Sequence, residues 1–133
     1  MIETHLALSL CRLEAEHGDR LAALDHCTLA VRNYHDAGNT SQLRIALAVL
    51  AGLLDRLGRY QSAAVIAGFA VSAFTTATIA EHGAAIAHLR DVLGEQTYES
   101  LARKGESMST AAMATYAYDQ INQVRAELNA VSN

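Results

Sequence analysis

No proline interrupts the 133 residues of the chain, and this feature restricts its possible folds more than any other. Proline breaks helix interiors, whereas alanine, which is abundant here, has the lowest intrinsic cost of being helical. The β-branched residues nowhere form the alternating pattern of a half-buried strand. The chain is therefore predicted to be all-α, and its length fits a single domain covering residues 1–133.

Glycines mark the pauses in the apolar helical pattern, where a left-handed C-cap is easily formed. These are Gly18, Gly38, Gly58, Gly83, Gly94 and Gly105. The intervening segments predict about seven helices, at 2–17, 19–37, 40–57, 60–76, 79–93, 95–104 and 109–130. Asp19 and Ser109 are expected to cap two of them, and Thr78 with Glu81 has the spacing of a capping box.

The distribution of apolar residues predicts how deeply each helix is buried. The segments 40–57 and 60–76 are apolar nearly all round, so they are expected between neighbouring helices. Gly52 and Gly68 lie inside them, and each costs about 1 kcal/mol relative to alanine. A close helix–helix approach is the expected compensation. The last helix carries one apolar stripe, formed by Met113, Ala117, Ile121, Val124 and Leu128.

An internal repeat appears when Gly18 is aligned with Gly58, 40 residues later. Four small, apolar or aromatic positions then match at identical offsets. In the first copy they are Leu24, Ala30, Tyr34 and Ala37, and in the second Ala64, Ala70, Phe74 and Ala77. The small residues let paired helices approach, and the loop glycine permits the tight turn of an antiparallel helix pair.

The segments around Gly18 and Gly58, each with the downstream pattern Ala-x3-aromatic-x2-Ala, resemble tetratricopeptide (TPR) repeats. The resemblance covers residues 5–77 and implies two TPR-like antiparallel helix pairs in a right-handed stack. Residues 78–133 are then expected to form capping helices that close one end. The Trp often found early in such repeats, and the Pro at their end, are missing.

A second resemblance covers residues 40–120. Leu93-Gly94-Glu95, the segment 105–109 and Tyr116-Ala117-Tyr118 are similar to the C-terminal region of large actinobacterial LuxR-type or AfsR-like regulators and their adenylate-cyclase-associated relatives. In those proteins a STAND-type ATPase precedes a TPR-like helical region. The resemblance implies a sensing or scaffolding segment of a transcriptional regulator.

Charge and cysteine content narrow the partners and the location. The formal net charge is −4, and Lys104 is the only lysine, so direct nucleic-acid binding is not expected. No apolar run approaches the ~20 residues that cross a membrane, and the first residues lack the basic start of a secretory signal. Cys11 and Cys27 are expected to be small buried apolar residues rather than a redox couple. A reducing cytoplasmic location is therefore predicted.

Motifs for catalysis, cofactors and metals are not found. The sequence lacks the glycine-rich phosphate-binding motifs and His-Glu-x-x-His, and the spacings of its six histidines do not suit a helical ligand pair. No catalytic residue, metal ligand or cofactor is therefore predicted, although a Ser-His-Asp or Cys-His-Asp arrangement is not excluded by composition. Tyr98, Tyr116 and Tyr118 either form a binding patch or pack their rings with the hydroxyl in water.

Two surfaces are candidates for binding. TPR-like stacking would bring one polar set to the concave face as a mixed-charge groove for a peptide, or leave it as an ordinary solvated surface with local ion pairs. The set is Arg12, Glu16, Asp19, Asp55, Arg56 and Arg59. The apolar first helix, with Leu6, Leu10 and Leu13, is expected to contact an upstream domain or a second copy of the chain.

These observations favour a non-catalytic, homodimeric protein-interaction or regulatory module of a bacterial signalling regulator. Two alternatives remain open: a helical accessory or assembly subunit of an enzyme complex, and a ligand-sensing or enzymatic bundle with a pocket near Gly52 and Gly68.

Overall fold

The computed structural model describes residues 19–71 and 80–132, and all regular structure in these ranges is helical. Six helices lie there: α2 (Arg20–Asp36), α3 (Thr40–Arg56), α4 (Tyr60–Ala70), α6 (Ala80–Leu93), α7 (Glu95–Glu106) and α8 (Thr110–Ser132). The all-α prediction is confirmed for this part of the chain. The helix predicted at 2–17 and the capping box at Thr78 lie outside the described residues.

Helix ends follow the predicted capping signals. The carboxylate of Asp19 accepts a hydrogen bond from the amide of Ala22 at 3.2 Å, and the hydroxyl of Ser109 accepts one from the amide of Ala112 at 3.1 Å. Among the described residues, three turns use a glycine with positive φ: Gly38 (70°), Gly58 (80°) and Gly94 (88°). The helix boundaries predicted from these glycines are therefore confirmed to within a residue or two.

Three expectations about local structure are corrected. Gly83 lies inside α6 and Gly105 in the last turn of α7, so neither ends a helix. The helix predicted over 60–76 ends at Ala70, because Val71 is extended (φ −62°, ψ 130°). Residues 72–76 lie outside the described ranges.

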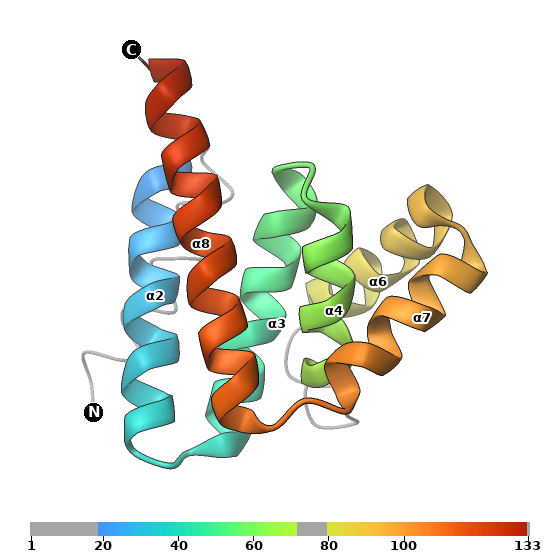
Figure 1. The fold of residues 1–133 in the computed structure, drawn as a ribbon, viewed down its shortest axis with the longest axis horizontal. Helices are drawn as coiled ribbons and strands as arrows, with labels where there is room; N and C mark the ends of the chain where they lie inside the picture. Colours follow the sequence, from blue (N-terminus) through green and yellow to red (C-terminus); the bar gives the residue numbers. More distant parts are fainter. Residues whose placement is uncertain (1–18, 72–79, 133) are drawn as a thin grey trace.

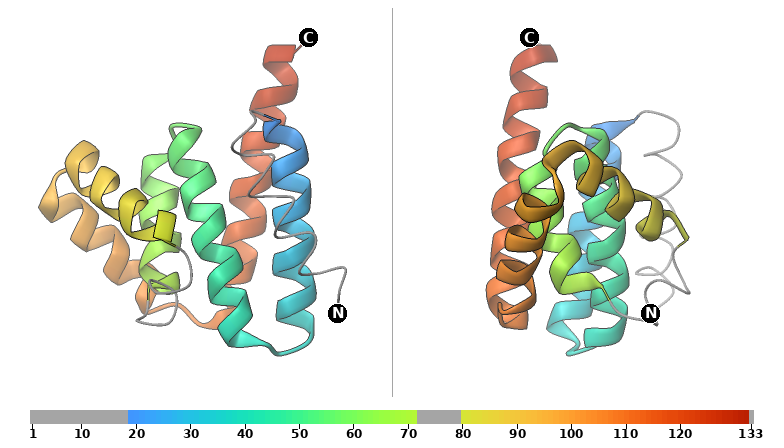
Figure 2. Two further views of the ribbon diagram at one scale, coloured as in Figure 1. Left: turned by 180° about the vertical axis from the view of Figure 1, so that it is seen from behind. Right: turned by 90° about the vertical axis from the view of Figure 1, so that its right-hand side faces the viewer.

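The helices pack in an order that the chain only partly follows. α2, α3 and α4 run up and down, each against the next, while α6 packs on α3 and α4, and α7 packs mainly on α4 (Figure 1). The last helix does not continue this order. α8 runs back antiparallel to α2 and packs on α2 and, less extensively, on α4 (Figures 1 and 2). The helices of the C-terminal part therefore take two different places. The helices α6 and α7 lie beyond α4, whereas α8 lies beside α2.

The core is centred on α3 and α4, the two helices predicted to be apolar all round. Residues 45–51 of α3 are all buried, and the next residue, Gly52, is partly exposed. Residues 62–70 of α4 are buried without exception. The predicted stripe of α8 also faces the core, with Met113, Ala117, Ile121 and Val124 at most 3% exposed. Burial of these apolar side chains is the main stabilising contribution.

Glycine permits an unusually close crossing of α4 and α7. A Cβ atom built on Gly68 would lie 2.1 Å from the carbonyl oxygen of Ala102, and one built on Gly105 would lie 1.8 Å from that of Val65. The close approach predicted for Gly68 is therefore confirmed. The prediction of a close helix–helix approach is wrong for Gly52, where an added Cβ would meet nothing within 4 Å.

Cys27 lies completely buried in the core, as expected from its size and polarity. Its sulfur is disulfide-bonded, so the expectation that Cys27 is only a small apolar residue and not part of a redox couple is wrong. Cys11 lies outside the described residues.

Candidate functional site

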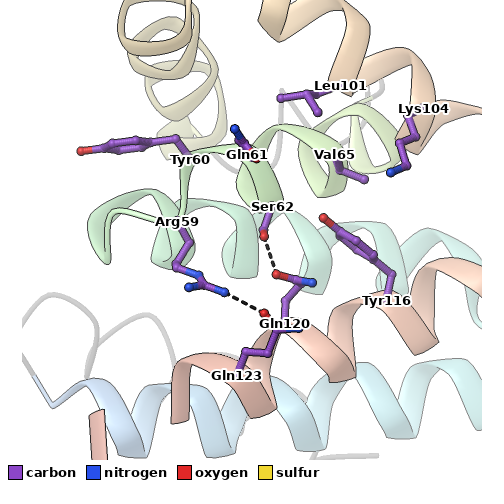
Figure 3. Close-up of a pocket in the computed structure, with 10 residues that line it drawn as sticks. All are labelled: Arg59, Tyr60, Gln61, Ser62, Val65, Leu101, Lys104, Tyr116, Gln120 and Gln123. Carbon is purple, nitrogen blue, oxygen red and sulfur yellow. Dashed lines mark hydrogen bonds between the residues drawn. The ribbon is translucent and has the colours of Figure 1, made fainter. Parts of the chain in front are cut away.

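A polar groove of about 420 Å³ lies where α4, α7 and α8 meet (Figure 3). Its volume is within the ~300–1,000 Å³ of typical small-ligand sites, but many of its side chains are polar. The lining residues are Arg59, Tyr60, Gln61, Ser62, Val65, Leu101, Lys104, Tyr116, Gln120 and Gln123. The groove therefore suits a polar ligand better than an apolar one.

Helical spacing brings these side chains to one place. Tyr116, Gln120 and Gln123 are four and three residues apart on α8, so they share a face. Leu101 and Lys104 are likewise three apart on α7. Arg59 follows the glycine turn at Gly58 and immediately precedes α4.

Two hydrogen-bonding side chains, one at the N-cap of α4 and one in its first turn, reach across the groove to α8. The guanidinium of Arg59 donates to the carboxylate of Glu127 at 2.8 Å and to the side-chain oxygen of Gln123 at 2.9 Å. The hydroxyl of Ser62, the one buried polar residue among those described, donates to the side-chain oxygen of Gln120 (Figure 3). These contacts fix the positions of α4 and α8 on either side of the groove.

Lys104 and Tyr116 lie at the other end of the groove from Arg59 (Figure 3). Lys104 is exposed in the last turn of α7, where the helix dipole stabilises a positive charge. Neither its ammonium group nor the half-buried Tyr116 hydroxyl has a hydrogen-bond or ion-pair partner among residues 19–71 and 80–132. Both groups are therefore available to a ligand.

The structure separates the members of the predicted charged face that it describes. Asp19 caps α2, and Arg56 is exposed at the end of α3. Asp55 pairs with α6 through His88, whereas Arg59 pairs with α8. Arg12 and Glu16, and the predicted contact residues Leu6, Leu10 and Leu13, lie outside the described residues. Of the described members of the predicted set, only Arg59 lines the polar groove.

A histidine–carboxylate pair, which was not predicted from the sequence, links α3 to α6. Nδ1 of His88 lies 2.7 and 3.0 Å from the two carboxylate oxygens of Asp55, whose side chain is 10% exposed. The ring of Tyr60 packs edge-on against His88, with centroids 5.9 Å apart. This geometry orients the imidazole and holds α6 on α3. The two residues are 33 positions apart, so no local spacing predicts their contact.

The three tyrosines considered as a binding patch face different neighbours. Tyr98 is 3% exposed beneath the guanidinium of Arg90, which lies 4.5 Å from its ring centre. Burial raises the pKa of the Tyr98 hydroxyl above 10.0, and the nearby Arg90 charge partly opposes this increase. Tyr118 is two residues from Tyr116 on α8 and faces Arg32 of α2, so Tyr116 is the one of these three tyrosines that lines the groove.

The sequence did not predict that the polar residues of the groove lie together, because they come from three separate helices. Ser62, Lys104, Gln120 and Gln123 carry no motif, and the only available signal was the polar spacing along the last helix.

Within the described ranges, no cluster of three or more His, Cys, Asp or Glu side chains is arranged to hold a metal ion. No helix in these ranges combines the length and apolarity needed to cross a membrane.

Comparison of the chain with known proteins found no matching family model, curated protein or solved structure.

Proposed function

We propose that the chain is a non-catalytic protein-interaction module that binds a short segment of a partner protein in the groove between α4, α7 and α8. The observation that carries this proposal is the groove itself. Interhelical hydrogen bonds from Arg59 and Ser62 hold its walls, and Lys104 and Tyr116 are left available. A site built on packed helices is pre-organised, which lowers the entropy lost on binding.

The wider context is part of the same proposal. The module belongs to a bacterial signalling or transcriptional regulator with a TPR-like helix stack, and it acts as a homodimer or beside an upstream domain. The burial of the repeat-related Leu24, Ala30, Ala64 and Ala70 supports a repeated helix pair. A cytoplasmic location is also proposed. The disulfide at Cys27 is the observation against it, since reducing compartments keep most thiols free.

Site-directed photo-crosslinking in the cells that encode the chain tests the groove. A photoreactive amino acid replaces Gln61, which is exposed in the groove, or Gln96, which is exposed on α7 outside it. The expected result is a discrete crosslinked protein from the Gln61 position and not from Gln96. Equal crosslinking from both positions, or none from either, would refute binding in the groove.

The identity of the crosslinked protein separates the proposed role from its alternative. A signalling protein or a sensory domain supports the regulatory module, whereas a single metabolic enzyme supports an accessory subunit. Light scattering after size-exclusion chromatography measures the mass of the purified chain, and a stable monomer would contradict the homodimer.

A further inference from the structure

The polar groups of the groove are not evenly divided between donors and acceptors. Arginine has no acceptor, so the atom of Gln123 that faces Arg59 is the amide oxygen. The NH₂ group of Gln123 is therefore turned away from Arg59. The amide oxygen of Gln120 is similarly occupied by the hydroxyl of Ser62, which leaves its NH₂ group as a donor. Two of the acceptors in the groove are thus already engaged by the protein.

The unengaged groups at the other end add further donors. Lys104 offers an ammonium group with three N–H bonds and no acceptor, and Tyr116 offers a hydroxyl. Together with the amides of Gln120 and Gln123, they bring donors into the groove from two helices, Lys104 from α7 and the other three from α8 (Figure 3). This set of donors matches a ligand that supplies only acceptors.

The charges in the groove point in the same direction. None of the ten lining residues is acidic, although the whole chain carries a net charge of −4. The charge of Arg59 is compensated by Glu127, whereas Lys104 has no acidic partner among the described residues. An uncompensated positive charge beside several donors favours an anion, because charge-assisted hydrogen bonds are about twice as strong as neutral ones.

From these contacts we infer that the Lys104–Tyr116 end of the groove is a carboxylate subsite, which binds Asp or Glu side chains of an acidic segment in the partner protein. This inference rests on the proposed function and specifies the chemistry of its ligand. In the bound state the Lys104 ammonium and the Tyr116 hydroxyl donate to the carboxylate oxygens, and the glutamine amides donate to the peptide carbonyls.

The test is an NMR titration of the ¹⁵N-labelled full chain with defined peptides. The probe is a pentapeptide, blocked at both ends, in which two glutamates alternate with glycines. We expect saturable shifts of the backbone amide of Lys104 and of the side-chain amides of Gln120 and Gln123. The same peptide with glutamines in place of the glutamates should give no saturable shift.

Two further ligands identify the source of the carboxylate. The glutamine peptide with a free C-terminus tests for recognition of a terminal carboxylate, and inorganic phosphate tests for a general anion site. Binding of either one with an affinity equal to that of the glutamate peptide would overturn the assignment to acidic side chains.

Matched variants test which residues bind the carboxylate. Lys104→Gln should weaken binding of the glutamate peptide about tenfold, and Tyr116→Phe about fivefold. Arg103→Gln is the control, because it removes the same charge from an exposed neighbour that lies outside the groove. Equal weakening by Lys104→Gln and Arg103→Gln would show a nonspecific charge effect and overturn the subsite.

The two proposals can fail separately. If Gln61 crosslinks a partner but Lys104→Gln leaves this crosslink and peptide binding unchanged, the carboxylate subsite is wrong and the interaction module stands. If the glutamate peptide binds through Lys104 but Gln61 captures no protein, the subsite stands and the protein-binding function fails.

Discussion

Substitution of Gly105 by alanine tests the close crossing of α4 and α7. An added Cβ would lie 1.8 Å from the carbonyl oxygen of Val65 and 2.8 Å from its carbonyl carbon, whereas ordinary contacts begin near 3.4 Å. Both atoms belong to the backbone of α4, so no side-chain rotation relieves the clash. The two helices have to move apart, and apolar contacts between them are lost.

The expected loss of stability is the difference between two opposing effects. Alanine is better than glycine inside a helix by about 1 kcal/mol. Overpacking a core costs about 1–3 kcal/mol, and a clash with a fixed backbone belongs at or above the upper end of that range. The free energy of unfolding should therefore fall by about 2 kcal/mol. At roughly 4 °C per kcal/mol for a domain of this size, Tm falls by about 8 °C.

Urea and thermal unfolding followed by circular dichroism measure this change. The matched control is Gly52→Ala, because Gly52 lies inside α3 and an added Cβ meets nothing within 4 Å. That substitution should raise the free energy of unfolding by about 1 kcal/mol, because alanine has a higher helix propensity than glycine. If Gly105→Ala is as stable as Gly52→Ala, α4 and α7 do not cross closely at Gly105, and the reasoning is refuted.

Further predictions concern the helix caps, the histidine pair and the response to pH. Asp19→Ala should lower the free energy of unfolding by about 1 kcal/mol through loss of the α2 cap; Asp19→Asn should keep most of it. A double-mutant cycle of His88→Ala and Asp55→Asn should give a coupling energy of about 0.5–1 kcal/mol, since half of the His88 side chain is exposed; a value of zero contradicts the contact. Burial raises the pKa of Tyr98 in the folded chain, so the unfolded chain loses its proton first and stability should fall as pH rises above about 10. Tyr98→Phe should make the alkaline part of the stability curve flatter than that of the wild-type chain, and an unchanged slope would argue against this contribution.

Most of the individual helices could be predicted from the sequence, because the turns and caps that end a helix depend on residues close together in the chain. Gly38, Gly58 and Gly94 end helices with a positive φ, which glycine adopts most easily, and Asp19 starts α2 through a bond to an amide three residues away. The stripe on α8 was also predictable, since 3.6-residue periodicity alone places Met113 and Ala117 on one face.

The candidate site depended on contacts between distant segments. Gly52 and Gly68 have the same helical setting, yet only Gly68 lies against a neighbouring backbone. Arg59 was singled out as part of a charged face with Asp55, but the structure directs these two side chains to α8 and α6 respectively. Nothing near either residue in the chain indicates those partners, which are 68 and 33 residues away.

The sequence by itself therefore determined the all-helical class, most helix boundaries and the buried faces of the long helices, because helix hydrogen bonds, caps and turns act within a few residues. Tertiary structure alone decided that α8 returns to α2 and forms a polar groove with α4 and α7. Packing of whole helix surfaces selects the neighbours of each helix. That selection depends on the combined shape of many side chains, so it cannot be derived from any one segment.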